Sequence, residues 1–338
     1  MAKTEAMAGE RPIFIVGMPR SGTTLLTTIL SAHPRIAISP ESHFLTYWVP
    51  TCRYLELNKT EDFRQFWQIL SQSQRFSYFD IDSDKALTNI LAKGTPSAAT
   101  IFTGWLETYA ERCHKPRWGE KTPLHYQHLA QLLDWFPNAQ VLWMLRDPRA
   151  VTASLLTMPW ASNYVHIHAE QWQQSTQLYT QQWQADPRVK LVRYEDLVQR
   201  TDHTLVGIFK FLNEDYPEGL LAQRSTQSVP TVNREGWALA HLNQTLQPVD
   251  ATALNRWQQQ LWPAHVAIVN SLTNKLQQRY GYTDGSHPPL PPQAMALLKL
   301  AKLRWKLDRK LLVWRSKLLG PSSRRAQDIG AQATIKTS

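Results

Sequence analysis

Residues 13–24 constrain the fold of this chain more than any other segment. The apolar run from Ile13 to Val16 predicts a short buried strand, and a glycine-framed loop from Gly17 to Thr24 follows it. A helical apolar pattern begins immediately afterwards, over residues 25–30. A strand, a Gly-rich loop and a helix in this order aim backbone N–H groups and a helix N-terminus at a phosphate-like anion. The segment therefore predicts an α/β fold with an anion site at the end of its first strand.

The loop departs from the common nucleotide-binding pattern at one position. Its spacing matches G-x-x-x-x-G-K-[ST], but Thr23 occupies the position of the lysine that reaches the β- and γ-phosphates. This difference argues against ATP or GTP. Arg20 places a positive charge at another point of the loop, which suits an anion on a shorter tail. The alternative interpretation is an ordinary helix N-cap by Ser21 or Thr23 after a tight turn.

Two further segments repeat the change from buried strand to polar residues. The apolar run at 140–145 ends in Arg146 and its neighbours, and residues 190–197 form a third junction of strand and helix. Strands that alternate with helices predict a mostly parallel sheet flanked by helices. In such sheets ligands bind outside the carboxyl ends of the strands. We therefore expect all three junctions to lie at one edge of the sheet.

Length and composition fit one large domain in a reducing compartment. The chain has 338 residues, is 43% hydrophobic and carries only two cysteines, Cys52 and Cys113, which cannot form a disulfide framework. The N-terminus lacks the apolar core of a signal peptide, and no stretch reaches membrane-spanning length. We expect a cytoplasmic protein with a domain at 11–283. Within it, residues 44–118 predict a helical insertion, which either shapes an acceptor pocket or packs around the sheet.

The positive charge is concentrated at the C-terminus. Of the net charge of +10, residues 295–338 carry +9, because eleven Lys and Arg stand there against two Asp. The nearly neutral body offers no basic stripe for a nucleic acid, so we expect no such partner. A Pro-rich linker at 284–294 precedes a basic amphipathic helix at 295–319 and a disordered tail. The helix suits contact with a membrane surface, which would make the protein peripheral to the membrane, and equally suits docking on its own domain or on a partner.

Two of these motifs together carry a family resemblance. The run from Pro19 to Leu25 (PRSGTTL) after one strand, with RDPRA at 146–150 and Ser154 after another, resembles the sulfotransferase family over about residues 11–282. The runs AHP at 32–34 and PES at 40–42 are most similar to the protein-tyrosine sulfotransferases and their bacterial relatives. The resemblance implies the sulfotransferase fold and transfer of a sulfuryl group from 3′-phosphoadenosine 5′-phosphosulfate (PAPS) to an acceptor hydroxyl. The product would be adenosine 3′,5′-bisphosphate, and no metal is implied.

The resemblance also implies roles for individual residues. Glu41 corresponds to the general base, with a surface ion pair or a helix cap as the alternative. Lys121 corresponds to a lysine that stabilises the transition state, with a solvated loop lysine as the alternative. His241 would donate to a sulfuryl oxygen. The residues implied in donor binding are Arg20, Ser21, Gly22, Thr23 and Thr24 for the 5′-phosphosulfate, Arg146 and Ser154 for the 3′-phosphate, and Tyr194, Gln244 and Arg256.

One loop differs from the family pattern. Relatives usually begin it with Ser and carry Lys or Arg before its Pro, whereas this chain has His241 and Gln247 there. Arg256, nine residues further on, supplies a basic group that would compensate. Two other functions remain open on sequence grounds: a P-loop kinase acting on a small molecule, and a degenerate non-catalytic protein that binds a nucleotide or a membrane. The resemblance implies an acceptor that bears a hydroxyl, and the sequence does not indicate the chemical class of that acceptor.

Overall fold

A computed structural model describes residues 11–51, 53–224, 254–283 and 289–318. The described residues divide into two compact units, one from the ranges 1–145 and 182–251 and the other from 146–181 and 252–338. The expected single domain at 11–283 thus stays a prediction. No helix within the described ranges is long and apolar enough to cross a bilayer.

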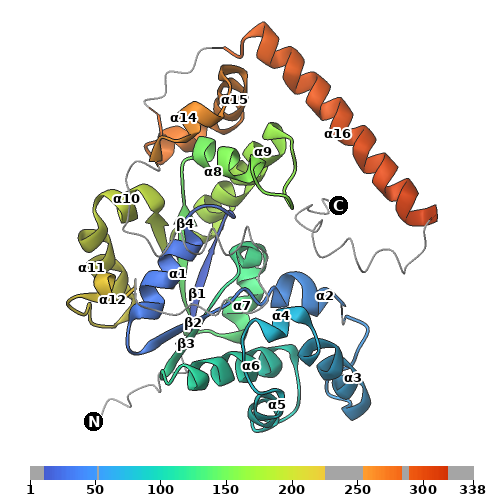
Figure 1. Ribbon diagram of the computed structural model, residues 1–338, viewed down its shortest axis with the longest axis vertical. Helices are drawn as coiled ribbons and strands as arrows, with labels where there is room; N and C mark the ends of the chain where they lie inside the picture. Colours follow the sequence, from blue (N-terminus) through green and yellow to red (C-terminus); the bar gives the residue numbers. More distant parts are fainter. Residues whose placement is uncertain (1–10, 52, 225–253, 284–288, 319–338) are drawn as a thin grey trace. The chain divides into compact units, whose positions relative to one another are not determined.

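The first unit contains a five-stranded parallel sheet (Figure 1). The strands are β1 (Ile13–Gly17), β2 (Ile36–Ser39), β3 (Arg117–Lys121), β4 (Gln140–Leu145) and β5 (Val189–Arg193). Their spatial order is β2-β3-β1-β4-β5, so β1 lies between β3 and β4. Because all neighbours run parallel, the carboxyl ends of the five strands meet at one edge. This is the α/β arrangement that the sequence predicts, and it places the first anion loop at that edge.

Helices connect and flank the strands of this unit (Figure 1). Between β1 and β3 the chain forms α1 (Thr23–Ala32), the π-helix η2 (Phe44–Trp48), α2 (Val49–Thr51), α3 (Thr60–Ser71), α4 (Gln74–Ser77), α5 (Ser83–Leu91) and α6 (Ala98–Arg112). The 3₁₀ helix η3 (Pro123–His128) and α7 (Leu129–Trp135) follow β3, and α10 (Tyr194–Gln199), α11 (Thr201–Leu212) and α12 (Leu220–Arg224) follow β5. The π-helix η4 (Tyr179–Trp183) precedes β5, and its first three residues belong to the second unit.

Aromatic side chains from the helical segment 44–118 fill the core beside the sheet. Phe44 stacks on Phe102 with ring centroids 4.7 Å apart, and Phe14 of β1 meets Trp118 of β3 edge to face at 5.9 Å. These rings are buried, as is Trp105 of α6. Such offset and edge-to-face pairs add to the stabilisation that comes from area burial alone. For these residues, packing around the sheet accounts for the aromatic content of the segment. The expected segment also overlaps β3, which begins at Arg117.

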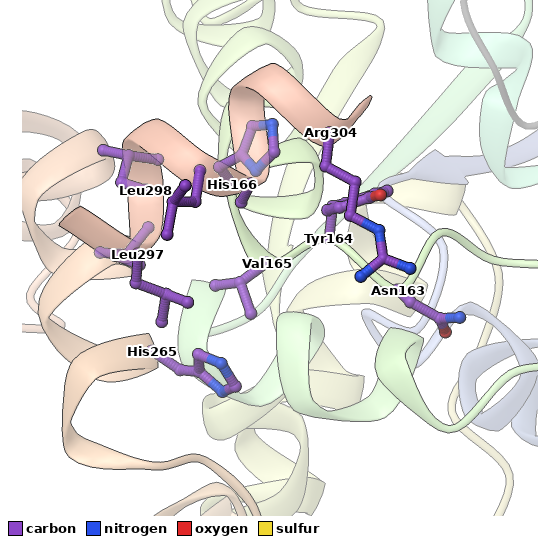
Figure 2. A pocket seen from close by; sticks show the side chains of 11 residues that line it. Asn163, Tyr164, Val165, His166, His265, Leu297, Leu298 and Arg304 are labelled. Carbon is purple, nitrogen blue, oxygen red and sulfur yellow. The ribbon is translucent and has the colours of Figure 1, made fainter. Parts of the chain in front are cut away.

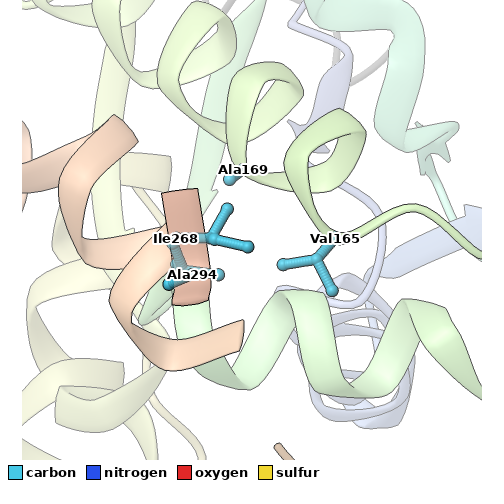
Figure 3. Close-up of a cluster of buried hydrophobic side chains, with 5 residues drawn as sticks. Val165, Ala169, Ile268 and Ala294 are labelled. Carbon is cyan, nitrogen blue, oxygen red and sulfur yellow. The ribbon is translucent and has the colours of Figure 1, made fainter. Parts of the chain in front are cut away.

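The second unit is helical. It contains α8 (Pro148–Leu156), α9 (Val165–Leu178), α14 (Trp257–Gln260), α15 (Pro263–Arg279) and α16 (Pro292–Leu318). A hollow of about 270 Å³ lies among residues of α9, α15 and α16 (Figure 2). Beside it, Val165 and Ala169 of α9, Ile268 of α15 and Ala294 of α16 form a buried apolar cluster (Figure 3). This cluster fixes the beginning of α16 on its own unit.

Candidate functional site

The loop that follows β1 has an unusual backbone. Gly17, Arg20 and Gly22 have φ angles of +136°, +72° and +90°, all in the left-handed region that side chains other than glycine rarely adopt. A Cβ on Gly17 would lie 2.3 Å from the carbonyl oxygen of Met144 on β4, so only glycine fits there. The amide of Ser21 donates to the carbonyl of Met18 at 3.2 Å and closes the turn. The backbone of Arg20 is therefore strained, and strained backbone residues are common in ligand-binding loops.

The start of α1 has hydrogen-bond donors that no side-chain cap satisfies. Gly22 is the N-cap residue and provides no side-chain cap, and the first turn contains no acidic side chain. Within the described residues, the buried Oγ of Ser21 has no hydrogen-bond partner. Free N–H groups at a helix N-terminus and an orphaned hydroxyl favour an anionic ligand. The residues from Ser21 to Thr24 therefore fit a phosphate or sulfate group, and Thr23 is itself buried, with a relative exposure of 4%.

Tyr194, the first residue of α10, packs directly against this loop. A Cβ built on Gly22 would lie 2.3 Å from Cδ2 of Tyr194 and 2.9 Å from Cε2. The half-buried tyrosine ring therefore occupies the space that any larger residue at position 22 would need. The structure brings together the first and third strand–helix junctions, which are about 170 residues apart in sequence.

Glu41 lies two residues beyond β2 and forms the centre of a charged cluster. Lys121, the last residue of β3, donates from Nζ to Oε1 of Glu41, and the Nε2 of His43 lies 3.0 Å from Oε2. Because a carboxylate only accepts, the hydrogen of the neutral His43 ring stands on Nε2. Arg75 of α4 contacts the carbonyl oxygen of Glu41 at 3.4 Å. The Glu41 side chain is 35% exposed while that of Lys121 is only 9% exposed, so the carboxylate reaches solvent and the ammonium lies beneath it.

The cluster fixes the charge of the carboxylate. Burial raises the pKa of Glu41, but the Lys121 charge and the hydrogen bond from His43 outweigh burial and hold that pKa well below its usual range. Burial lowers the pKa of His43, and the nearby Arg75 charge lowers it further, against the opposite effect of Glu41. At neutral pH the site therefore presents an ionised carboxylate between a cation and a neutral imidazole.

A second carboxylate, that of Glu120, links several residues around Glu41 by hydrogen bonds. Its Oε1 accepts from the backbone N–H of Ser42 at 3.1 Å, from Ser42 Oγ at 2.8 Å and from Thr122 Oγ1. Its Oε2 accepts from Nδ1 of His125 at 3.1 Å, while Nε2 of the same ring accepts from the backbone N–H of Leu45. Burial raises the pKa of Glu120, and these donors together outweigh burial and lower it. Glu120 thus ties the residues after Glu41 to β3 and positions the base candidate.

The junction after β4 is built differently and belongs to the second unit. Asp147 caps α8 by accepting from the backbone N–H of Arg149 at 2.8 Å, and it also pairs with the Arg149 guanidinium at 2.6 Å. Arg149 further donates to the carbonyl of Tyr282 at 2.9 Å and stacks on the ring of Trp257. Arg149 is therefore engaged by its own unit.

The other two residues expected at this junction are half-buried. Arg146 is held by its backbone, whose carbonyl oxygen accepts from Nε1 of Trp172 at 2.7 Å. Ser154 lies near the end of α8.

The remaining residues expected at the site are distributed as follows. His241, Gln244 and Gln247 lie outside the described residues. Arg256 is exposed at the N-cap of α14, in the second unit. Sequence reasoning missed His43, Arg75, Glu120 and His125. For His43 a signal was available, because it stands two residues after Glu41 and close to the PES run.

Comparisons with known proteins show what this chain is similar to. A family model described as the sulfotransferase family matches residues 12–218. A protein-tyrosine sulfotransferase of Drosophila melanogaster is 25% identical over 82% of this chain, and protein-tyrosine sulfotransferase 1 of Danio rerio is 26% identical over 82%. The matched part of the chain spans about half, 52%, of the Drosophila relative and 74% of the zebrafish relative.

Solved structures show the same fold. The sulfotransferase domain of the Synechococcus olefin synthase superposes with a TM-score of 0.59 at 23% identity, covering 83% of this chain and 98% of that domain. The sulfotransferase domain from the curacin biosynthetic pathway gives a TM-score of 0.57 at 22% identity, covering 81% and 98%. At these identities the likeness establishes the architecture of the chain.

Proposed function

Because the chain belongs to the sulfotransferase family, we propose that it transfers the sulfuryl group of PAPS to an acceptor hydroxyl, with Glu41 as the general base. The observation that carries the proposal is the Glu41 carboxylate, partly exposed and in contact with Lys121 and His43 at the carboxyl edge of the sheet. The anion loop after β1 starts from the same edge, since β1 and β3 are neighbouring strands. A base, a cation and an anion cradle are what sulfuryl transfer requires.

The loop residues would hold the 5′-phosphosulfate of the donor. The orphaned hydroxyl of Ser21 and the first-turn N–H groups at Thr23 and Thr24 supply hydrogen bonds, and Arg20 supplies charge. Tyr194, packed on Gly22, would keep the loop in its strained conformation and contact the nucleotide. For the 3′-phosphate we retain Arg146 and Ser154, the ligands that the family resemblance implies. His241, Gln244 and Arg256 complete the proposed donor contacts.

The charged cluster also suggests how the base is controlled. Bound PAPS supplies the sulfuryl group: the acceptor oxygen bonds to sulfur as the bond to the bridging phosphate oxygen breaks, and adenosine 3′,5′-bisphosphate leaves. The proton of the acceptor hydroxyl goes to Glu41. Without donor, the Lys121 charge keeps the pKa of Glu41 low and the carboxylate weakly basic. A negative sulfuryl group nearby would attract the Lys121 ammonium away from Glu41, so the carboxylate becomes more basic when the reaction needs it.

Binding and turnover test the proposal separately. Calorimetry with adenosine 3′,5′-bisphosphate should show binding to the wild type, and Arg20→Ala and Arg146→Ala should each weaken it roughly tenfold to a hundredfold, as expected for a lost charged hydrogen bond. Arg64→Ala is the matched control, because Arg64 is exposed and pairs with Glu61 one turn away on the same helix. Wild-type affinity in both site variants would refute the donor site.

For turnover, radiolabelled PAPS is supplied with a panel of hydroxyl acceptors. A tyrosine-containing peptide comes first, because the relatives are named protein-tyrosine sulfotransferases. Glu41→Gln should retain binding of the bisphosphate and lose about two to four orders of magnitude in rate. An unchanged rate would exclude Glu41 as the base. A thermal shift with ATP and Mg²⁺ but none with the bisphosphate would instead favour the kinase alternative.

A further inference from the structure

Residues along one side of the helix α16 contact the rest of its unit. Ala294 is buried in the cluster of Figure 3 and Leu298 packs beside it. Further along, the Trp305 ring lies 6.4 Å from the His166 ring, and Asp308 accepts from the hydroxyl of Tyr164 at 2.5 Å. At about 100° per residue, these four positions span a sector of about 80° around the helix. Next to this sector, Lys302 pairs with Glu170 of α9 at 2.9 Å.

Four leucines form a separate row on the same helix. Leu300, Leu303, Leu307 and Leu311 are spaced by three or four residues and are between 52% and 65% exposed. Their mean direction is about 140° from that of the docked stripe. The apolar residues that the sequence places on one broad face therefore divide into a docked stripe and an exposed leucine row. A contiguous apolar row in water marks an interaction surface.

Basic side chains border the leucine row on both sides. Exposed Lys299, Lys306 and Lys310 follow one border, and Arg304 stands on the other. The acidic residue of this stretch, Asp308, is bonded to Tyr164 on the docked side. An apolar row with a cationic border is the pattern of helices that lie in the interface of an anionic membrane.

The apolar surface continues beyond the row into the hollow of Figure 2. Leu297 and Leu300 of α16 line this hollow together with Val165 of α9 and Ile268 of α15. Arg304 and Asn163 lie together at one side of it, with Leu297 and Leu298 opposite (Figure 2). The row thus adjoins a hollow that has apolar side chains from three helices and a guanidinium at its margin.

We propose that α16 binds the surface of an anionic phospholipid bilayer, with the leucine row in the acyl boundary and the bordering cations on the phosphates. A second copy of the chain fits less well as occupant. Pairing two leucine rows would place the lysines of each border against those of the other helix, and like charges at close range repel. An anionic surface instead neutralises them. This proposal does not depend on sulfuryl transfer.

Vesicle flotation with the full chain tests the proposal. We expect the wild type to float with vesicles of phosphatidylcholine containing about one third phosphatidylserine, and to float poorly with phosphatidylcholine alone. Binding should weaken as salt rises, because screening shortens the reach of the lysines. Failure to float with the anionic vesicles at low salt would overturn the proposal.

Two sets of variants separate the apolar and charged contributions. Leu303→Ser with Leu307→Ser should lower partitioning at least roughly tenfold, whereas the matched exposed pair Leu91→Ser with Val206→Ser, outside α16, should not. Glutamine at Lys299, Lys306 and Lys310 should lower it roughly a hundredfold. Glutamine at the exposed Lys59, Lys210 and Lys275 changes net charge equally and should have little effect.

Self-association through the leucine row is the competing explanation, and the mass of the protein in solution tests it. Light scattering should give the same mass for the wild type and the leucine variant. A dimer that Leu303→Ser with Leu307→Ser dissociates would assign the leucine row to self-association and overturn the membrane proposal. Equal flotation of the wild type and the leucine variant would also overturn it. Because both leucines are exposed, the variant should keep the wild-type melting temperature.

Discussion

Replacing Gly22 with alanine tests the packing that shapes the anion loop. Gly22 has a φ angle of +90°, and an added Cβ would lie 2.3 Å from Cδ2 of Tyr194. An ordinary carbon–carbon contact begins near 3.4 Å, so the tyrosine ring would have to move by about 1 Å. The substitution therefore combines a backbone cost with a steric one, and both act on the residues that we propose as donor ligands.

The two costs can be estimated separately. An alanine in the left-handed region costs about 1 kcal/mol. Displacing a packed side chain costs about 1–3 kcal/mol. The sum is about 2–4 kcal/mol, and each kcal/mol lowers the melting temperature of a domain of this size by about 2–4 °C. Gly94 provides the control, because its φ angle is +95° and nothing lies within 4 Å of an added Cβ. Gly94→Ala should thus show the backbone cost alone.

Thermal and urea unfolding measure both variants. Gly22→Ala should be less stable than Gly94→Ala by about 1–3 kcal/mol, and adding Tyr194→Ala to Gly22→Ala should recover part of the steric cost, a coupling that a double-mutant cycle isolates. Gly22→Ala should also bind adenosine 3′,5′-bisphosphate more weakly, whereas Gly94→Ala should bind like the wild type. Equal stability losses for the two glycine variants, or no coupling to Tyr194, would refute the packing argument.

Three other predictions concern charged and hydrogen-bonded groups. Glu120→Gln should destabilise the fold by about 2–3 kcal/mol in urea unfolding, because a buried carboxylate loses its charge-assisted bonds, while exposed Glu111→Gln should cost far less. Because the pKa of Glu41 is lowered in the folded state, its carboxylate stabilises the fold above the ordinary pKa of 4.5, and this contribution is lost as the pH falls through the folded pKa. The difference in unfolding free energy between the wild type and Glu41→Gln should therefore shrink from about pH 7 to about pH 3. A constant difference would contradict the ion pair with Lys121. Tyr164→Phe removes the bond to Asp308 and should speed hydrogen exchange in α16, which mass spectrometry can follow; unchanged exchange would show that the bond does not hold the helix.

Strands with continuous apolar sequences were predictable, and one central strand was not. The runs at 13–16 and 140–145 match β1 and β4, because strands buried on both faces of a parallel sheet read as unbroken apolar segments. β3 has the sequence RWGEK and is nevertheless buried throughout. Arg117 tolerates burial by donating to the carbonyl of Leu212 at 2.7 Å and to Glu214 at 3.1 Å. These partners come from α11 and the residues after it, so local pattern gives no sign of them.

Site residues that belong to a sequence motif were predictable. Site residues that are brought there only by tertiary packing were not. Glu41 and Lys121 follow from the family resemblance, and the structure places them in contact. The roles of base and transition-state cation remain predictions. Arg75 reaches the same cluster from α4, 34 residues further along the chain, and no spacing rule links it to Glu41. In the same way, helical periodicity identifies the apolar residues of α16 but not which of them its neighbours cover.

Two carboxylates with lowered pKa values, Glu41 after β2 and Glu120 in β3, differ in their surroundings. Glu120 is enclosed and accepts from four donors that belong to the fold itself, so an acceptor hydroxyl has no access to it. The Glu41 side chain is 35% exposed, and in the proposed mechanism a negative ligand would attract the Lys121 ammonium. A pKa shift alone would select both residues equally. Its exposure and its contact with Lys121 are what distinguish Glu41 as the proposed base, and the bonds of Glu120 link the residues after Glu41 to β3.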